Sequence, residues 1–61
     1  MDKELEIREA AETLLRIWYA KDGKAEDFQK IARVLHELTG RPQFLGTHVY
    51  EMKNLAEGYL K

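Results

Sequence analysis

The sequence predicts an all-α fold, a three-helix bundle of helix-turn-helix type that forms a single domain over residues 1–61. Apolar residues recur at helical spacing in three separate stretches, which predicts helices over residues 2–20, 25–39 and 46–60. Two turn sequences, Asp22-Gly23 and Thr39-Gly40-Arg41-Pro42, separate these stretches. A chain of 61 residues without Cys is small, so its stability must come from apolar packing, helix propensity or a partner chain.

The first predicted helix, residues 2–20, has one apolar stripe widened by two flanking residues. The stripe consists of Ile7, Ala11, Leu14 and Trp18, and the flanking residues are Leu15 and Tyr19. Two pairs of opposite charge at i,i+4 spacing, Glu4–Arg8 and Glu12–Arg16, favour the helix. The Asp22-Gly23 turn is expected to end it through a left-handed glycine.

The second predicted helix, residues 25–39, has the most regular apolar pattern. The pattern consists of Phe28, Ile31, Leu35 and Leu38, flanked by Ala32 and Val34. Glu26 and Asp27 favour the start of the helix, and Glu26 can pair with Lys30. Gly40 supplies the left-handed residue that ends it.

The third predicted helix, residues 46–60, has two alternative starts. Pro42 could open it, but Gly46 would then lie inside the helix at a cost of about 1 kcal/mol, which favours a start at Gly46 or Thr47 with Thr47 as N-cap. Its inward stripe is Leu45, Val49, Met52, Ala56 and Tyr59, and its end is favoured by a Glu57–Lys61 pair. The predicted core is centred on Trp18, Phe28, Leu35 and Val49. Ile17, Val34, Phe44 and Leu60 are spare, that is, apolar residues that this core does not require.

The net charge of −1 is unevenly distributed along the chain. Residues 1–12 contain five acidic and two basic side chains, and the rest is slightly basic. The N-terminus lacks the basic and apolar stretches of a signal peptide, and no apolar run approaches the ~20 residues that span a bilayer. We therefore expect a cytoplasmic protein, or a nuclear one in a eukaryote, without a membrane role. The absence of Ser could reflect biased genome composition or design.

The residue inventory argues against an enzyme. The chain has no Ser or Cys nucleophile and no Gly-rich phosphate loop, so we expect no small-molecule substrate and no cofactor. His36 and His48 are the only imidazoles, and two His without Cys fall short of a metal site.

A sharp break between two short helices, preceded by another helix, is typical of DNA-binding helix-turn-helix domains. We therefore predict binding to double-stranded DNA through the third helix. The residues expected to face base edges are Gln43, Thr47, His48, Glu51 and Asn54, and the expected phosphate contacts are Arg41, Lys30, Arg33 and Lys53. The alternative is a protein-interaction or self-associating module, natural or designed, because near-zero net charge and spare apolar residues suit a partner chain or homodimer. A positive surface around the third helix would favour DNA, and an exposed apolar patch would favour a protein partner.

The segment Asp27-Phe28-Gln29-Lys30-Ile31-Ala32 resembles the start of the second helix of Myb/SANT domains, a group of three-helix DNA-binding domains. Gly40-Arg41 resembles the Gly-Arg turn of this group, and Tyr50 falls at the spacing of its third-helix aromatic residue. The resemblance implies that the third helix enters the major groove or docks on a protein. If Tyr50 lay in the core, the third helix would be rotated by one residue relative to the apolar stripe given above. The sequence therefore leaves two alternatives for the buried face of this helix.

Overall fold

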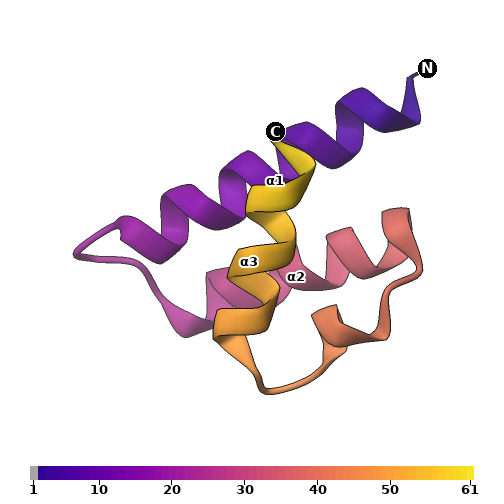
Figure 1. Cartoon of the computed structure of the whole chain (residues 1–61). Coiled ribbons are helices and arrows are strands. Elements are labelled where there is room, and N and C mark those ends of the chain that lie inside the picture. Colours follow the sequence, from indigo (N-terminus) through magenta and orange to yellow (C-terminus); the bar gives the residue numbers. More distant parts are fainter. Residues whose placement is uncertain (1) are drawn as a thin grey trace.

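The computed structural model describes residues 2–61, which form three α-helices and one short 3-10 helix; Met1 lies outside the described residues. The elements are α1 (Lys3–Tyr19), α2 (Ala25–Thr39), η1 (Pro42–Leu45) and α3 (Val49–Tyr59). In Figure 1, α1 and α2 run in opposite directions and α3 crosses them steeply. Helix α1 packs against both α2 and α3, whereas α2 and α3 make little direct contact within residues 2–61. The predicted all-α three-helix bundle is confirmed.

Helix α1 is one residue shorter at each end than predicted. The Asp2 carboxylate caps its start by accepting a hydrogen bond from the backbone N–H of Glu4 at 3.0 Å. Its end at Ala20 has extended backbone, and the expected left-handed conformation of Gly23 is wrong, because Gly40 is the only residue of the described chain with positive φ. Gly23 is required for another reason: a Cβ atom there would collide with the carbonyl oxygen of Ile17.

Helix α2 begins and ends at the predicted residues. Gly40 follows it with φ 72°, and its N–H donates to the carbonyl of His36 at 2.8 Å. This is the single hydrogen bond of a left-handed cap, as the sequence predicts. The Thr39 hydroxyl donates to the carbonyl of Leu35 at 2.7 Å and accepts from the N–H of Arg41 at 3.3 Å, so it orders the first step of the turn.

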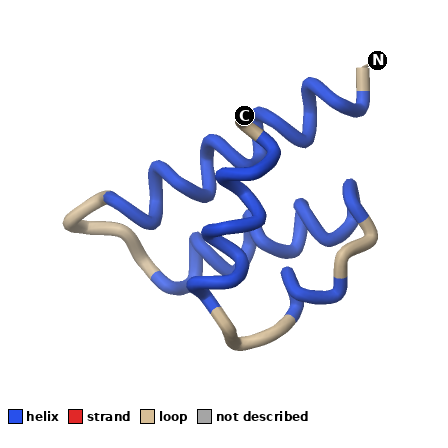
Figure 2. Tube along the Cα trace, in the orientation of Figure 1, coloured by secondary structure: helices blue, strands red, loops and turns tan. Residues whose placement is uncertain are grey.

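The start of α3 differs from both predicted alternatives. Pro42 opens η1 rather than α3, and α3 begins only at Val49. Thr47 is therefore not the N-cap; His48 occupies that position without a side-chain capping hydrogen bond. Residues 40–48 connect α2 to α3, so the connection is longer than the roughly three or four residues of a tight helix-turn-helix. Figure 2 shows η1 as a separate helical turn within this connection.

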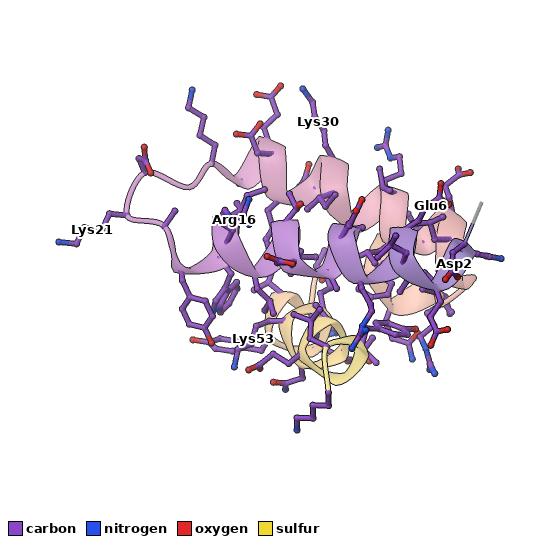
Figure 3. All side chains as sticks on the ribbon, turned by 90° about the horizontal axis from the view of Figure 1, so that it is seen from above. Asp2, Glu6, Arg16, Lys21, Lys30 and Lys53 are labelled. Carbon is purple, nitrogen blue, oxygen red and sulfur yellow. The ribbon has the colours of Figure 1, made fainter. Side chains whose placement is uncertain are left out.

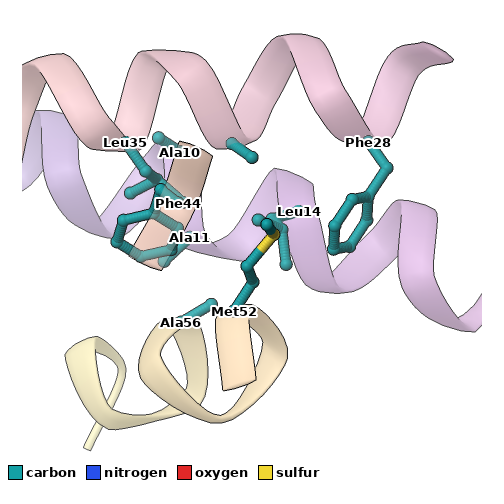
Figure 4. Packing of buried hydrophobic residues seen from close by; sticks show 9 residues of the cluster. Ala10, Ala11, Leu14, Phe28, Leu35, Phe44, Met52 and Ala56 are labelled. Carbon is teal, nitrogen blue, oxygen red and sulfur yellow. The ribbon is translucent and has the colours of Figure 1, made fainter. Parts of the chain in front are cut away.

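The core is formed by side chains from all four elements, which Figure 4 shows converging between the helices. The buried residues are Ala10, Ala11, Leu14, Phe28, Ala32, Leu35, Phe44, Met52 and Ala56. The predictions for Phe28 and Leu35 are confirmed, and the prediction that Phe44 is spare is wrong, because it is only 2% exposed. It is buried because η1 packs on α2.

The inward face of α3 is only partly as predicted. Met52 and Ala56 are buried, but Val49 is 39% exposed and Leu45 is 57% exposed, because both precede or begin the helix rather than lying along it. Tyr50 is 72% exposed, so the core position that the Myb/SANT resemblance suggests for it is wrong. Tyr19, expected to widen the stripe of α1, is also exposed.

Candidate interaction surface

Most of the large exposed apolar side chains lie at the ends of three helical elements. The exposed set is Leu5, Tyr19, Val34, Leu45, Val49 and Tyr50. Four of these six come from the end of α1, the end of η1 and the start of α3. We call this region the aromatic end, defined by Trp18, Tyr19, Leu45, Val49 and Tyr50. Such clustering matters because exposed apolar residues are unremarkable singly but mark interaction sites when contiguous.

Trp18 links the exposed and buried aromatic residues. Its ring lies 5.1 Å from that of Tyr50, edge to face, and 5.8 Å from that of Phe28. Phe28 is buried, Trp18 is half-buried and Tyr50 is exposed, so the aromatic contacts run from the core to the surface. These contacts fix the Trp18 ring at the surface, where a rigid aromatic side chain can contact a partner with little loss of conformational entropy.

Two hollows lie on this region and share part of their walls. The larger, ≈ 380 Å³, is formed by α2, the end of η1 and the start of α3; the smaller, ≈ 260 Å³, is formed by the α1–α2 turn and neighbouring residues. Both are lined by Phe28, Gln29 and Val49, so we treat them as one feature, the shared groove. Both are open to solvent; the lining of the smaller hollow, which includes Trp18, is mainly apolar, whereas that of the larger, which includes Leu45, mixes polar and apolar surface.

The charged residues that line the shared groove are all basic. Arg33 lines the larger hollow and Lys24 lines the smaller one, while no carboxylate lines either. Within residues 2–61 the ion pairs are Arg16–Glu12, Lys30–Glu26 and Lys53–Glu57, so neither groove cation is neutralised by a paired carboxylate. The groove therefore combines apolar side chains with one basic residue in the lining of each hollow.

On α3, Lys53 and Glu57 form the shortest ion pair of the described residues, 2.8 Å between Nζ and Oε1. The hydrogen bond to Glu57 raises the pKa of Lys53, partial desolvation lowers it, and the Glu57 charge and the Tyr19 hydroxyl raise it further. Glu57 thus pairs with Lys53 rather than with Lys61 as predicted, and the predicted Glu4–Arg8 pair is not formed within the described chain.

The residues predicted to contact DNA are distributed over several surfaces. Arg41 donates from Nε to the hydroxyl of Tyr59 at 2.8 Å, which places it beside the C-terminal end of α3. Thr47 and His48 precede the N-terminal end, about 15 Å away along the helix. Gln43 is half-buried, and its Oε1 atom has no hydrogen-bond partner.

The remaining predicted DNA contacts divide between α2 and α3. Glu51 and Asn54 are exposed on α3, where Lys53 is held by Glu57. Lys30 and Arg33 lie on α2, with Lys30 paired to Glu26. Only Thr47 and Arg33 of the predicted set line the same hollow.

Sequence reasoning missed the groove itself. Lys24 and Leu45 were not predicted as site residues, and Val49 was assigned to the core. The adjacent apolar residues Val49-Tyr50 offered a signal, because helix neighbours point in different directions and two large ones do not easily share a narrow buried face.

Other kinds of site find little support in the described residues. His48 is exposed and His36 half-buried, and no group of three or more His, Cys, Asp or Glu in residues 2–61 could hold a metal ion. None of the helices in that range has the length and apolar character needed to cross a membrane. Comparisons with protein-family models, curated proteins and solved structures found no match for this chain.

Proposed function

We propose that this three-helix domain is a protein-interaction module whose shared groove binds an amphipathic helix with apolar anchors and flanking carboxylates. One observation supports this most directly: apolar side chains line both hollows of an exposed groove whose charged lining residues, Lys24 and Arg33, are both basic and unpaired. Charge complementarity selects an acidic partner, since opposite charges favour encounter and like charges disfavour it.

A helical partner suits the shape of the groove. Helix-in-groove recognition uses apolar side chains one helical turn apart, and the two hollows meet at Phe28, Gln29 and Val49. Trp18 and Tyr50 flank the groove as aromatic residues, the type most enriched among residues that dominate binding energy.

DNA binding through α3 stays a prediction and is the less favoured one. A DNA-binding surface needs cations that together follow the phosphate backbone. Here Lys53 and Lys30 are each paired with a carboxylate, and Arg41 lies beside Tyr59 at the far end of α3 from Thr47. The exposed start of α3 presents Val49 and Tyr50 instead.

A peptide-binding titration tests the proposal. The probe is a labelled helical peptide with Leu on one face and Glu on the other, and the matched probe replaces each Glu with Lys. We expect the protein to bind the acidic probe and Val49→Asp to weaken binding about tenfold or more, because the new carboxylate lies where both hollows meet. Asp at the start of α3 is compatible with the helix dipole, so folding should persist.

The control is Val34→Asp, which makes the same substitution at a similarly exposed position (45% against 39%) outside the groove. It should bind the acidic probe as the wild type does. Equal binding of the basic probe, or equal weakening by both variants, would contradict the proposal. Binding of mixed duplex DNA at low salt, without peptide binding, would restore the DNA-binding prediction in its place.

A further inference from the structure

The chain contains a segment with the chemistry that the shared groove selects. Residues 2–9 include four carboxylates, Asp2, Glu4, Glu6 and Glu9, against two basic residues. Among them Leu5 is 55% exposed on the first turns of α1. An exposed leucine on a helix with adjacent carboxylates is the type of anchor that a groove with apolar and basic lining residues would bind.

This acidic segment cannot reach the groove of its own chain. Leu5 and Trp18 belong to one continuous helix, and their separation along its axis is about 20 Å. Figure 3 shows Asp2 and Glu6 at one end of the molecule and Lys21 at the other. The N-terminal turns of α1 therefore lie at the opposite end of the molecule from the α1–α2 turn, where Lys24 lines the smaller hollow.

The chain also exposes somewhat more surface than a compact monomer of its mass, and part of this surface could be buried by a partner. The chain exposes 4592 Å². A compact monomer of 7.2 kDa is expected to expose roughly 4,100 Å², about a tenth less. With a net charge of only −1, long-range repulsion between copies is weak.

We infer that the helix bound by the shared groove is the acidic N-terminal part of α1 from a second copy of this chain, with Leu5 as its anchor. This inference rests on the proposed function, because it names the partner of the same groove. The two contacting surfaces differ, so the contact is head-to-tail, and each copy has one groove and one acidic segment to offer.

Analytical ultracentrifugation of the full chain over a concentration series, to ~1 mM, tests the inference. We expect the average mass to rise with concentration and to fall when salt is added, since part of the contact is ionic. Leu5→Gln removes the anchor from one surface, and Val49→Asp blocks the other. Each should weaken self-association about tenfold or more. Leu5→Met, which keeps an apolar side chain, should associate like the wild type.

Mixing the two defective variants gives the sharpest test. The Leu5→Gln chain keeps an intact groove, and the Val49→Asp chain keeps an intact acidic segment. An equimolar mixture should therefore form a dimer at concentrations at which neither variant associates alone. A mixture that stays monomeric, or a wild type that is monomeric at every concentration, would overturn the inference.

The same measurements separate this inference from the proposed function. Val49→Asp could still abolish binding of the acidic peptide probe while the wild type stays monomeric; the groove would then bind another protein and not a second copy. Self-association that survives both Leu5→Gln and Val49→Asp would place the contact elsewhere and also overturn the inference.

Discussion

The α1–α2 pair and the η1–α3 segment use their apolar residues differently. In the pair, buried positions recur along two long helices, and the exposed apolar residues Leu5 and Val34 lie outside the aromatic end, to which Tyr19 belongs. In the η1–α3 segment, exposed Leu45 and Val49 lie between buried Phe44 and Met52 in the sequence. The difference indicates that the pair mainly builds the core, whereas the shorter segment contributes to the core and to a surface that can bind a partner.

The two regions also differ in helix capping and in helix length. Helix α1 has a side-chain N-cap at Asp2, and α2 ends in a left-handed glycine cap at Gly40. Helix α3 has 11 residues and an N-cap, His48, without a side-chain hydrogen bond. An isolated helix of that length is marginal in water, so α3 depends on its packing against α1.

The largest expected effect comes from Phe44, the residue that attaches η1 to the core. Phe44→Ala should destabilise the fold by about 3–5 kcal/mol, because it removes a fully buried ring. A domain of 61 residues has a total stability of roughly 3–9 kcal/mol, so much of the variant should be unfolded. Urea denaturation followed by circular dichroism measures this.

The neighbouring variant Leu45→Ala is the control. Leu45 is 57% exposed, so its truncation should change stability by only about 0.5 kcal/mol. Similar losses for Phe44→Ala and Leu45→Ala would remove the distinction between the core and surface sides of η1.

A smaller effect is expected at two glycines that belong to different regions. Gly40 has φ 72°, so Gly40→Ala should cost about 1 kcal/mol despite open space around the new methyl group. Gly58 lies inside α3, also with open space, and Gly58→Ala should stabilise the protein by roughly 0.5–1 kcal/mol. Thermal unfolding of both variants checks the signs. A stabilising Gly40→Ala would contradict the left-handed cap.

The sequence predicts the α1–α2 pair better than the segment after it, for a physical reason. Helix α2 has a regular stripe with a glycine stop, and both of its ends are predicted correctly. Pro42 is compatible with the first turn of any helix, so the sequence does not distinguish the 3-10 turn that forms from the start of α3. The burial of Phe44 depends on how that turn packs on α2, which is tertiary information.

The candidate surface was harder to predict than the fold. Spare apolar residues and low net charge predict an interaction surface, but they do not predict where on the molecule it lies. Phe28 and Val49 are distant in sequence, and it is the packing of the folded chain that brings them to line one groove. The unpaired state of Lys24 and Arg33 likewise depends on which carboxylates lie within reach.

The smallest effect concerns Lys53 of α3, whose pKa is affected by Glu57 of the same helix and by Tyr19 of the aromatic end. Its pKa is raised above the ordinary 10.5, chiefly by the hydrogen bond to Glu57, so the charged form stabilises the folded state. That contribution is complete below pH 10.5 and is lost as the pH rises through the higher folded pKa. As the pH rises above 10.5, the denaturation midpoint of the wild type should fall slightly more than that of Lys53→Met. Glu57→Gln should remove most of the difference, whereas Tyr19→Phe should remove less, because Glu57 is the larger cause. Parallel pH profiles for the wild type and Lys53→Met would show that this ion pair adds nothing to the stability of α3.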